Sequence, residues 1–229
     1  MSQTKRPNLG AQSPSLKAVP FFTQLSEAEI ELVRSLASEK HYPKNAVVLT
    51  EGEMGDSLYM IQSGKVKVFI GDQEGREMIL KILGPGDFFG EMSMIDKQPR
   101  SASVTTLEGS VFLVMSHSSF EKCIEQVPRI ATIVMRILAQ RVREADKKIG
   151  TLALMDVYGR VASTLLELAV VDNGKMMVSE KLSQQDLANM VGASREMVNR
   201  ILKDLAERGF ISVESKSITI INHELPPSL

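Results

Sequence analysis

A helix-forming segment without glycine or proline divides this chain into two unlike parts. Pro128 suits the first turn of a helix, and no helix breaker follows it until Gly150. Ten of the fifteen glycines lie in residues 1–127, and only five lie in residues 128–229. A long helix between a turn-rich part and a glycine-poor part indicates two domains, which fits a length of 229 residues.

The first part has the pattern of short strands joined by turns. Residues 65–70 (KVKVFI) alternate polar and apolar side chains before becoming apolar, as in a half-buried strand. Glycines recur at spacings typical of an all-β barrel or roll. They are Gly52, Gly55, Gly64, Gly71, Gly75, Gly84 and Gly86. Ahead of them, Ser26 and Glu29 have the spacing of a capping box, which predicts a helix start.

The dividing segment carries a stripe of mainly apolar side chains at steps of three or four. Its members are Ile130, Val134, Ile137, Arg141, Ala145, Ile149 and Leu152. Such a helix can pack on its own domain or pair with the same helix of a second copy. We favour the dimer, because a long amphipathic helix between two domains is well placed to pair with its twin. Six Lys or Arg against two acids also concentrate positive charge here.

Residues 182–208 have the signature of two helices joined by a tight turn. Ser183 and Asp186 can cap the first helix, and Ser194 can cap the second. Gly192 stands where a tight helix–helix turn needs glycine. Two helices with a short glycine-containing turn make a candidate helix-turn-helix.

The second of these helices has two unlike faces at roughly 100° per residue. The apolar face consists of Val198, Ile201, Leu202 and Leu205. The opposite face consists of Arg195, Glu196, Asn199 and Arg200. These polar side chains suit guanine, cytosine and adenine edges. Any surface helix with salt bridges would show similar charges. The caps, the turn, the basic linker helix and a predicted hairpin over 210–221, which could form a wing, favour DNA binding.

A second motif lies in the β-rich part. Gly90 and Glu91 are followed, nine residues after Glu91, by Arg100 and Ser101. Glycine lets backbone N–H groups approach an anion, arginine can bind a phosphate through two hydrogen bonds, and glutamate can accept from a ribose hydroxyl. An ordinary surface pair in a loop would look the same. Asp87 suits a turn, and we assign it no ligand role.

The run 194–200 (SREMVNR) and the run 154–160 (LMDVYGR) resemble the cyclic-AMP receptor protein/FNR family of bacterial transcription regulators. The resemblance covers about residues 20–222. It implies DNA contacts from Ser183, Gln184, Gln185, Ser194, Arg195, Glu196, Met197, Asn199 and Arg200. Among these, Arg195, Glu196 and Arg200 resemble a triplet that reads TGTGA-type half-sites. Asn199 stands where the cyclic-AMP receptor has glycine, which leaves the outermost base of the half-site open.

The resemblance also gives the second motif a role, because it is similar to the phosphate-binding cassette of cyclic-nucleotide-binding domains. The ligand residues this implies are Gly90, Glu91, Met92, Arg100, Ser101, Ala145 and Asp146. Arg100 and Ser101 would hold the cyclic phosphate. Ala145 and Asp146 depart from the threonine and serine that face adenine in the cyclic-AMP receptor. Cyclic AMP is therefore the leading effector, and cyclic di-GMP is an alternative.

The resulting fold class is α+β, in four segments. We expect a disordered arm over 1–19, a jelly-roll-like cyclic-nucleotide-binding β-roll over 20–127, a dimerisation helix and hinge over 128–154, and a winged helix-turn-helix over 155–229. Beyond the long helix we expect three or four helices and then a short extended tail. The joining segment 170–181 is shorter than the family's polymerase-contacting loop, so RNA polymerase contact and the sign of regulation stay open.

Several other classes of protein fit this sequence poorly. A single cysteine, Cys123, excludes an intrachain disulfide and a cysteine-held iron–sulfur cluster. The scattered His41, His117 and His223 suit surface positions better than haem, metal or cupin-like enzyme sites. We therefore expect no enzyme, no metal and no covalently bound cofactor. A nucleotide-binding module without DNA is a second rival. Without a membrane span or signal peptide, we expect a cytoplasmic protein whose partners are a palindromic duplex, a second copy and RNA polymerase.

Overall fold

The computed structural model describes residues 24–172, 175–178, 183–214 and 217–222. The arm predicted for residues 1–19 lies outside this part of the chain. The first element is helix α1 (Glu27–Ser35), and its capping box is confirmed. The backbone N–H of Ser26 donates to the Glu29 carboxylate at 2.7 Å, and the Glu29 N–H donates back to the Ser26 hydroxyl at 3.4 Å.

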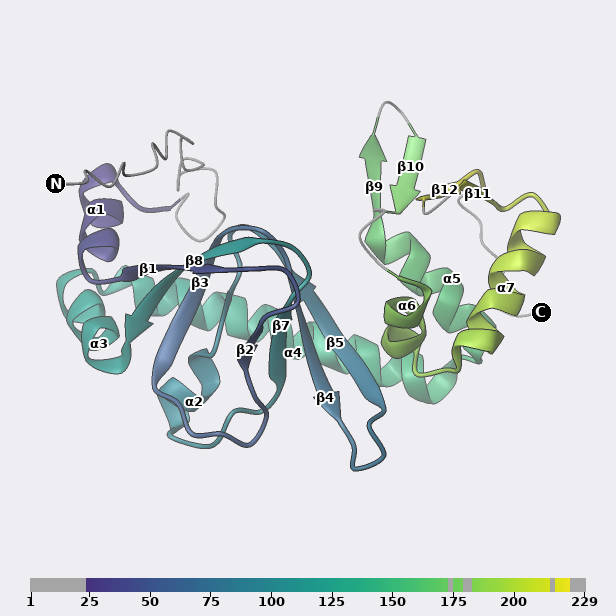
Figure 1. Cartoon of the computed structure of the whole chain (residues 1–229). Coiled ribbons are helices and arrows are strands. Elements are labelled where there is room, and N and C mark those ends of the chain that lie inside the picture. Colours follow the sequence, from purple (N-terminus) through teal and green to yellow (C-terminus); the bar gives the residue numbers. More distant parts are fainter. Residues whose placement is uncertain (1–23, 173–174, 179–182, 215–216, 223–229) are drawn as a thin grey trace, which may run out of the picture.

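Two antiparallel four-stranded sheets form the predicted β-roll (Figure 1). The first sheet has the order β1 (Ser38–Tyr42), β8 (Ser110–Ser116), β3 (Ser57–Ser63) and β6 (Phe88–Phe89). The second has the order β2 (Val47–Leu49), β7 (Ser103–Thr106), β4 (Val66–Gly71) and β5 (Glu77–Leu83). The strand predicted over residues 65–70 is β4. The short helix α2 (Glu91–Asp96) follows β6, and α3 (His117–Gln126) follows β8.

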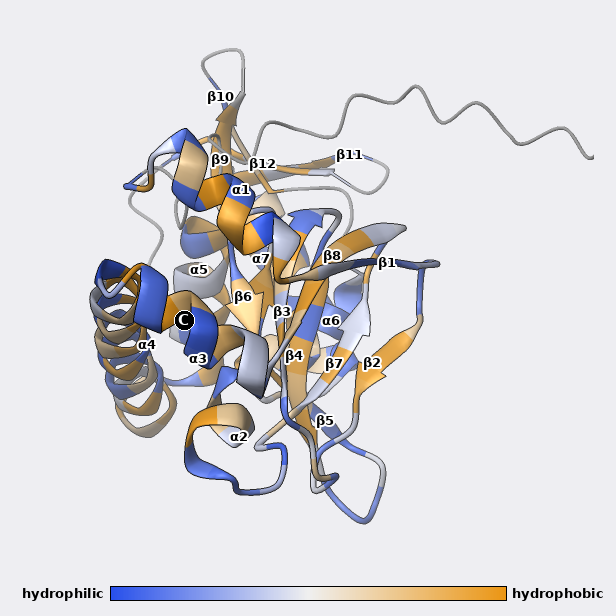
Figure 2. Ribbon diagram, turned by 90° about the vertical axis from the view of Figure 1, so that its left-hand side faces the viewer, coloured by the Kyte–Doolittle hydropathy of each residue, from blue (hydrophilic) through white to orange (hydrophobic). Residues whose placement is uncertain are grey.

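The core of the roll has two parts. Between the sheets, Ile61, Val66 and Phe112 are almost fully buried. Helices α1, α3 and the start of α4 cover a second cluster that reaches β3 and β8. Much of the hydrophobic colour in Figure 2 accordingly lies on the strands and on α1.

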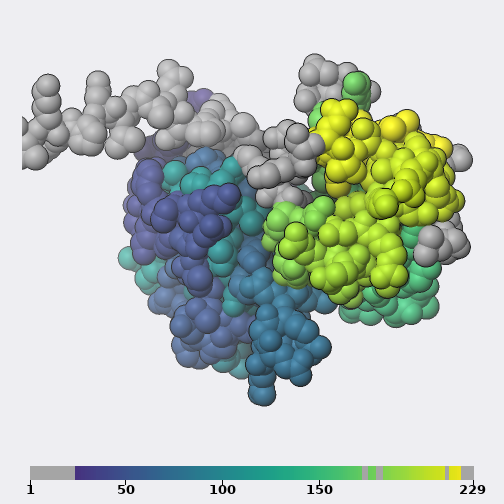
Figure 3. Space-filling model, turned by 45° about the vertical axis from the view of Figure 1, so that its right-hand side comes forward, coloured from purple at the N-terminus to yellow at the C-terminus, as the bar shows by residue number. Residues whose placement is uncertain are grey.

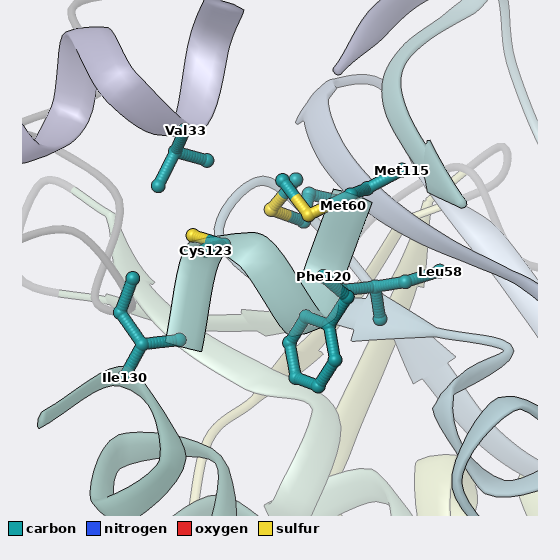
Figure 4. A pocket seen from close by; sticks show the side chains of 7 residues that line it. All are labelled: Val33, Leu58, Met60, Met115, Phe120, Cys123 and Ile130. Carbon is teal, nitrogen blue, oxygen red and sulfur yellow. The ribbon is translucent and has the colours of Figure 1, made fainter. Parts of the chain in front are cut away.

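A small cavity within the second cluster is enclosed by side chains from two strands and three helices (Figure 4). Its lining residues are Val33, Leu58, Met60, Met115, Phe120, Cys123 and Ile130. Burial raises the pKa of the Cys123 thiol, which keeps it protonated and unreactive. An apolar cavity of this kind cannot recognise a phosphate, so the candidate nucleotide site lies elsewhere in the roll.

Helix α4 (Arg129–Leu154) is the predicted long helix, and Pro128 precedes it. The N-terminal part of the predicted stripe packs inside the chain: Ile130 and Val134 are buried in the roll, and Ile137 packs against them. For this part the alternative of packing on its own domain is correct. The exposed apolar residues of α4 include Met135 and Val142, which lie beside the predicted stripe, and Ile149, which belongs to its C-terminal part.

The described residues of the C-terminal domain form three helices and a four-stranded sheet. The helices are α5 (Val157–Leu168), α6 (Gln184–Val191) and α7 (Arg195–Glu207). The sheet has the order β11 (Ile211–Glu214), β12 (Ser217–Ile220), β10 (Lys175–Val178) and β9 (Ala169–Asp172). The hairpin predicted over 210–221 is β11 and β12. The β9–β10 hairpin corrects the expectation of helices followed only by an extended tail. The sequence signal for this hairpin is the pair Asn173-Gly174, which lies between the runs 170–172 (VVD) and 175–178 (KMMV).

Candidate functional site

The helix-turn-helix predicted from the capping residues is present. At the start of α6, the Ser183 hydroxyl accepts from the Asp186 N–H at 3.0 Å, and the Asp186 carboxylate accepts from the Ser183 N–H at 2.9 Å. Gly192 ends this helix with φ of 65°, a conformation that favours glycine. The Ser194 hydroxyl then accepts from the Met197 N–H at 3.2 Å and starts α7.

Helix α7 has the two faces that its sequence predicts. The buried face carries Val198, Ile201, Leu202 and Leu205. Arg195, Glu196 and Arg200 are exposed. Figure 3 shows the C-terminal domain, in green and yellow, packed beside the roll. Within the described ranges, no ion pair or hydrogen bond joins these three side chains to a neighbour. Their guanidinium and carboxylate groups therefore face solvent, which weakens the interpretation of this face as a salt-bridged surface.

Two of the proposed base-reading residues on α7, Met197 and Asn199, are less exposed than the other three. Met197 packs against the domain core. Asn199 is half-buried, and its Oδ1 atom is buried without a hydrogen-bond partner among the described residues. At the start of α6, Gln184 and Gln185 are exposed, and Gln185 Nε2 donates to Asn189 Oδ1 at 2.8 Å.

The glycine–glutamate–arginine motif forms a compact buried cluster. Arg100 is 6% exposed, and its Nη1 atom donates to the Gly90 carbonyl and to Ser93 Oγ, both at 2.6 Å. Its Nη2 atom donates to the Ser57 carbonyl at 3.2 Å. Gly90 has φ of 82°, and a Cβ there would lie 2.7 Å from the Ser57 carbonyl oxygen. A Cβ on Gly55 would lie 2.4 Å from the guanidinium. Close approach to Arg100 therefore requires both glycines.

The charge of Arg100 has no direct counter-ion. Within the described part of the chain, no carboxylate lies within ion-pair distance of it, and its hydrogen bonds go to neutral oxygens. Burial lowers the pKa of Arg100, but an arginine stays protonated because its ordinary pKa is far above neutral. A buried cation without a paired anion is costly, and an anionic ligand would offset that cost.

Glu91 is already paired. It is 4% exposed, and its Oε1 atom accepts from Arg141 Nη1 at 2.7 Å. Arg141 also donates to the Phe88 carbonyl, and its guanidinium stacks 4.6 Å from the centre of the Phe88 ring. The sequence does not assign Arg141 to the site, and its only signal there is its polar place in the apolar stripe of α4.

The other proposed ligand residues are less enclosed. Ser101 Oγ contacts Met92 Sδ at 3.5 Å, and both residues are exposed beside the cluster. Ala145 and Asp146 lie on α4 and are exposed in the single chain. The structure thus brings Gly90, Glu91 and Arg100 together and leaves the α4 pair facing solvent. Asp87 accepts from the Gly84 N–H in a turn, as expected.

The histidines do not gather. His41 is exposed and contacts Glu39, whereas His117 is half-buried and contacts Glu121; His223 lies outside the described residues. In the described ranges there is no group of three or more His, Cys, Asp or Glu residues that could hold a metal ion. Likewise, no described helix is long and apolar enough to cross a membrane.

Comparison with known proteins supports both sites at the level of domains. The model of the cyclic nucleotide-binding domain matches residues 39–127, and that of the Crp-like helix-turn-helix domain matches residues 159–225. A CRP-like cAMP-activated global transcriptional regulator from Mycobacterium tuberculosis is 41% identical over 187 residues, covering 80% of this chain and 84% of that one. The cyclic AMP receptor protein of Thermus thermophilus is 33% identical, covering 90% and 94%.

Solved structures show the same architecture. The c-di-GMP responsive global regulator CLP of Xanthomonas campestris superposes with a TM-score of 0.77 at 26% identity, covering 86% of this chain and all of that one. The catabolite activator protein of Thermus thermophilus gives a TM-score of 0.55 at 32% identity, covering 90% and 95%. The predicted α+β fold is confirmed, and the chain belongs to the cyclic-AMP receptor protein/FNR family of DNA-binding transcription regulators.

Proposed function

We propose that this chain is a homodimeric regulator that reads TGTGA-like palindromic half-sites and is gated allosterically by a cyclic nucleotide, with cyclic AMP favoured. The observation that carries the nucleotide assignment is the buried guanidinium of Arg100, which has no direct counter-ion. Three of its five N–H donors are used by Gly90, Ser93 and Ser57, so two remain for a cyclic phosphate.

The choice between effectors depends on Ala145 and Asp146. Alanine cannot hydrogen-bond a base, and an ionised aspartate can accept but not donate. A carboxylate here suits the amino group of adenine or a guanine edge. The named relatives respond to cyclic AMP in one case and to cyclic di-GMP in the other. Cyclic AMP is the first ligand to test because the relative of higher identity is the cAMP-activated one.

The DNA assignment is supported by the exposed face of α7. Arg195, Glu196 and Arg200 are free to meet base edges, and α7 starts at the Ser194 cap, where a recognition helix meets the bases. Asn199 is half-buried, so it would reach a base only with a change of side-chain conformation. Ser183, Gln184 and Gln185 stand at the other helix start, where phosphate contacts are expected.

The dimer is supported by the exposed face of α4. Met135, Val142 and Ile149 recur every seven residues and are 61%, 60% and 63% exposed. Ala145 and Leu152 follow Val142 and Ile149 at the spacing of a coiled-coil seam, whereas Leu138, at the equivalent position after Met135, packs partly on its own roll. Pairing two copies along this seam would bring Ala145 and Asp146 of each chain near the partner's pocket. It would also present two recognition helices to a palindrome.

Fluorescence anisotropy of a labelled TGTGA–TCACA duplex at fixed salt tests this function. The protein is titrated alone and with cyclic AMP, cyclic GMP or cyclic di-GMP, with a scrambled duplex as the control. We expect cyclic AMP to tighten binding to the palindrome and to leave the scrambled duplex unchanged. If the protein binds the palindrome tightly and none of the three nucleotides changes its affinity, gating by these nucleotides is refuted. If the protein binds both duplexes equally, recognition of the TGTGA half-site is refuted.

RNA polymerase is the remaining proposed partner. Val170 and Val171 of β9 are exposed at the edge of the C-terminal sheet and offer an apolar contact surface. Replacing both by serine should leave duplex binding unchanged and weaken capture of polymerase on the bound operator. Unchanged capture would remove this surface from the proposal.

A further inference from the structure

A buried tyrosine fastens the start of α5 to the C-terminal end of α7. These two helices pack against each other in the C-terminal domain (Figure 1). Tyr158, in the first turn of α5, is 2% exposed, and its ring lies in the apolar core of that domain. Its hydroxyl donates to Asp204 Oδ2 of α7 at 2.8 Å. The side chain thus combines a ring that is fixed by packing with one directional bond to a charged acceptor.

Arg208 completes this contact. Its Nη1 atom donates to the Tyr158 hydroxyl at 3.2 Å and lies 3.4 Å from Asp204 Oδ2. Its guanidinium also lies 5.2 Å from the centre of the Phe210 ring. A partly exposed Asp–Arg pair one helical turn apart contributes little by itself. Here the buried hydroxyl bonds to both partners, so Tyr158, Asp204 and Arg208 form one unit, which we call the Tyr158 clasp.

The hydroxyl of the clasp remains a hydrogen-bond donor at neutral pH. Burial raises the pKa of the Tyr158 phenol, and the hydrogen bond to the Asp204 carboxylate raises it further. The ordinary pKa of a tyrosine is already about 10. The phenol therefore stays protonated, and Asp204 keeps its donor.

Burial of the apolar face of α7 constrains the tilt of this helix less than it constrains its depth. Val198, Leu202 and Leu205 bury that face, but apolar contacts are not directional. A hydrogen bond weakens when its length or angle changes. The Tyr158 clasp therefore opposes tilting and sliding of α7 along α5.

The clasp lies at the opposite end of α7 from the start of the proposed base-reading face. Asp204 follows Arg195 by nine residues, which is about 14 Å along the helix at a rise of about 1.5 Å per residue. A tilt of about 10° around the clasp would therefore move Arg195 by roughly 2 Å. The useful length of an N–H···O hydrogen bond varies by only about 0.5 Å. A small loss of order at the clasp is thus large enough to misplace a side chain that reads a base.

We propose that Tyr158 is a positioning residue for DNA reading, which acts through the clasp to set the tilt of α7 and hence its base preference. Tyr158 itself meets no base, because its side chain is buried in the domain core. This inference rests on the proposed reading of the TGTGA half-site by α7. It does not depend on which nucleotide binds, since all three residues of the clasp lie in the C-terminal domain.

Removal of the hydroxyl alone tests this role. Tyr158→Phe keeps the buried ring, and we expect it to bind the TGTGA–TCACA duplex about 10-fold more weakly than the unmodified protein does. Binding to the scrambled duplex should change less, so the ratio of the two affinities falls. Fluorescence anisotropy measures both affinities under the nucleotide condition that gives the unmodified protein its tightest binding. Glu207→Gln is the matched control, because Glu207 pairs with Lys203 at the same end of α7.

A merely structural role of the hydroxyl predicts a different result. Urea denaturation would then show a lower free energy of unfolding for Tyr158→Phe, while the folded variant would keep the affinity ratio of the unmodified protein. That result would overturn the positioning role and leave the proposed function standing. If the unmodified protein itself binds both duplexes equally, the positioning role and the proposed half-site both fail.

A double-variant cycle with Asp204 tests whether the hydroxyl acts through the clasp. Asp204→Ala should lower the affinity ratio as Tyr158→Phe does, and the double variant should fall no further than the weaker of the two. Asp204→Asn keeps an oxygen acceptor and should retain part of the ratio. Additive losses in the double variant, or an unchanged ratio in Asp204→Ala, would overturn the clasp. Asp204→Ala also keeps the proposal testable if Tyr158→Phe does not fold.

Discussion

Arg141 of α4 donates to Glu91 at 2.7 Å, and this pair joins the long helix to the segment that also holds Gly90 and Arg100. Both partners are largely enclosed, and Arg141 also binds the Phe88 carbonyl. A ligand that engages Glu91 must therefore act on a carboxylate that α4 already holds. The pair links the proposed nucleotide-binding residues directly to the proposed dimer helix.

Removing Arg141 should destabilise the protein. Arg141→Ala leaves Glu91 buried without its counter-ion, and breaking such a pair costs about 3 kcal/mol of unfolding free energy. Arg143→Ala is the control, because Arg143 is exposed on the same helix. Urea denaturation followed by circular dichroism measures both. Equal stability of the two variants would show that the pair contributes little.

Replacing Arg100 should remove the response to nucleotide. Arg100→Gln keeps a polar side chain but removes the charge, and the loss of a buried charged contact costs about 3 kcal/mol, or roughly 100-fold in affinity. Isothermal titration with cyclic AMP measures the binding, and circular dichroism checks the fold. Arg76→Gln, on the exposed β4–β5 turn, should bind as the unmodified protein does. A folded Arg100→Gln variant with unchanged affinity would contradict the phosphate role.

Gly90 should not tolerate a side chain. Its φ of 82° disfavours any other residue, and a Cβ would lie 2.7 Å from a carbonyl oxygen and 2.9 Å from Arg100 Nη1. Gly90→Ala should therefore cost about 2 kcal/mol or more in unfolding free energy. Gly75→Ala shares the positive φ but meets open space, so it separates backbone strain from the clash. If both variants lose the same unfolding free energy, the clash of the Cβ at position 90 adds nothing to the cost of the backbone strain.

The exposed face of α7 should carry the specificity for DNA. Arg195→Ala and Arg200→Ala should each weaken binding to the TGTGA duplex by about 1–3 kcal/mol and relax the preference at one base pair. Lys203→Ala is the control on the same helix, because Lys203 pairs with Glu207 away from the start of the helix. Competition with single-base-substituted duplexes measures both affinity and preference. A uniform loss across all duplexes would indicate phosphate contact instead.

A charge on the proposed seam should separate the dimer. Val142→Asp places a carboxylate opposite its own copy in the middle of α4, and like charges in an apolar seam repel. Sedimentation velocity should show the monomer where the unmodified protein shows the dimer. Val47→Asp is the control, because Val47 is 63% exposed on the roll, away from α4. A dimer that persists in Val142→Asp would place the interface elsewhere.

The elements most accurately predicted were those with local signals. The Ser26, Ser183 and Ser194 caps marked helix starts, and the apolar face of α7 is the buried one. These features depend on hydrogen bonds and periodicity within a few residues, so they can be inferred without the rest of the chain. The β9–β10 hairpin replaces the joining segment expected over 170–181, although the sequence carries a local hairpin signal there, the pair Asn173-Gly174.

The order of the two parts, the helix-turn-helix and the residue types around Gly90 and Arg100 can be inferred from the amino-acid sequence, because each follows from short-range pattern and side-chain chemistry. Packing of distant elements is needed to show that Arg141 holds Glu91, that the first part of the α4 stripe packs on its own roll, and that Glu77 reaches α6 through Asn189. The Arg141–Glu91 pair joins residues 50 positions apart and the Asn189–Glu77 pair joins residues 112 positions apart, and no periodicity specifies such pairings. They arise only when the packed elements bring the side chains together.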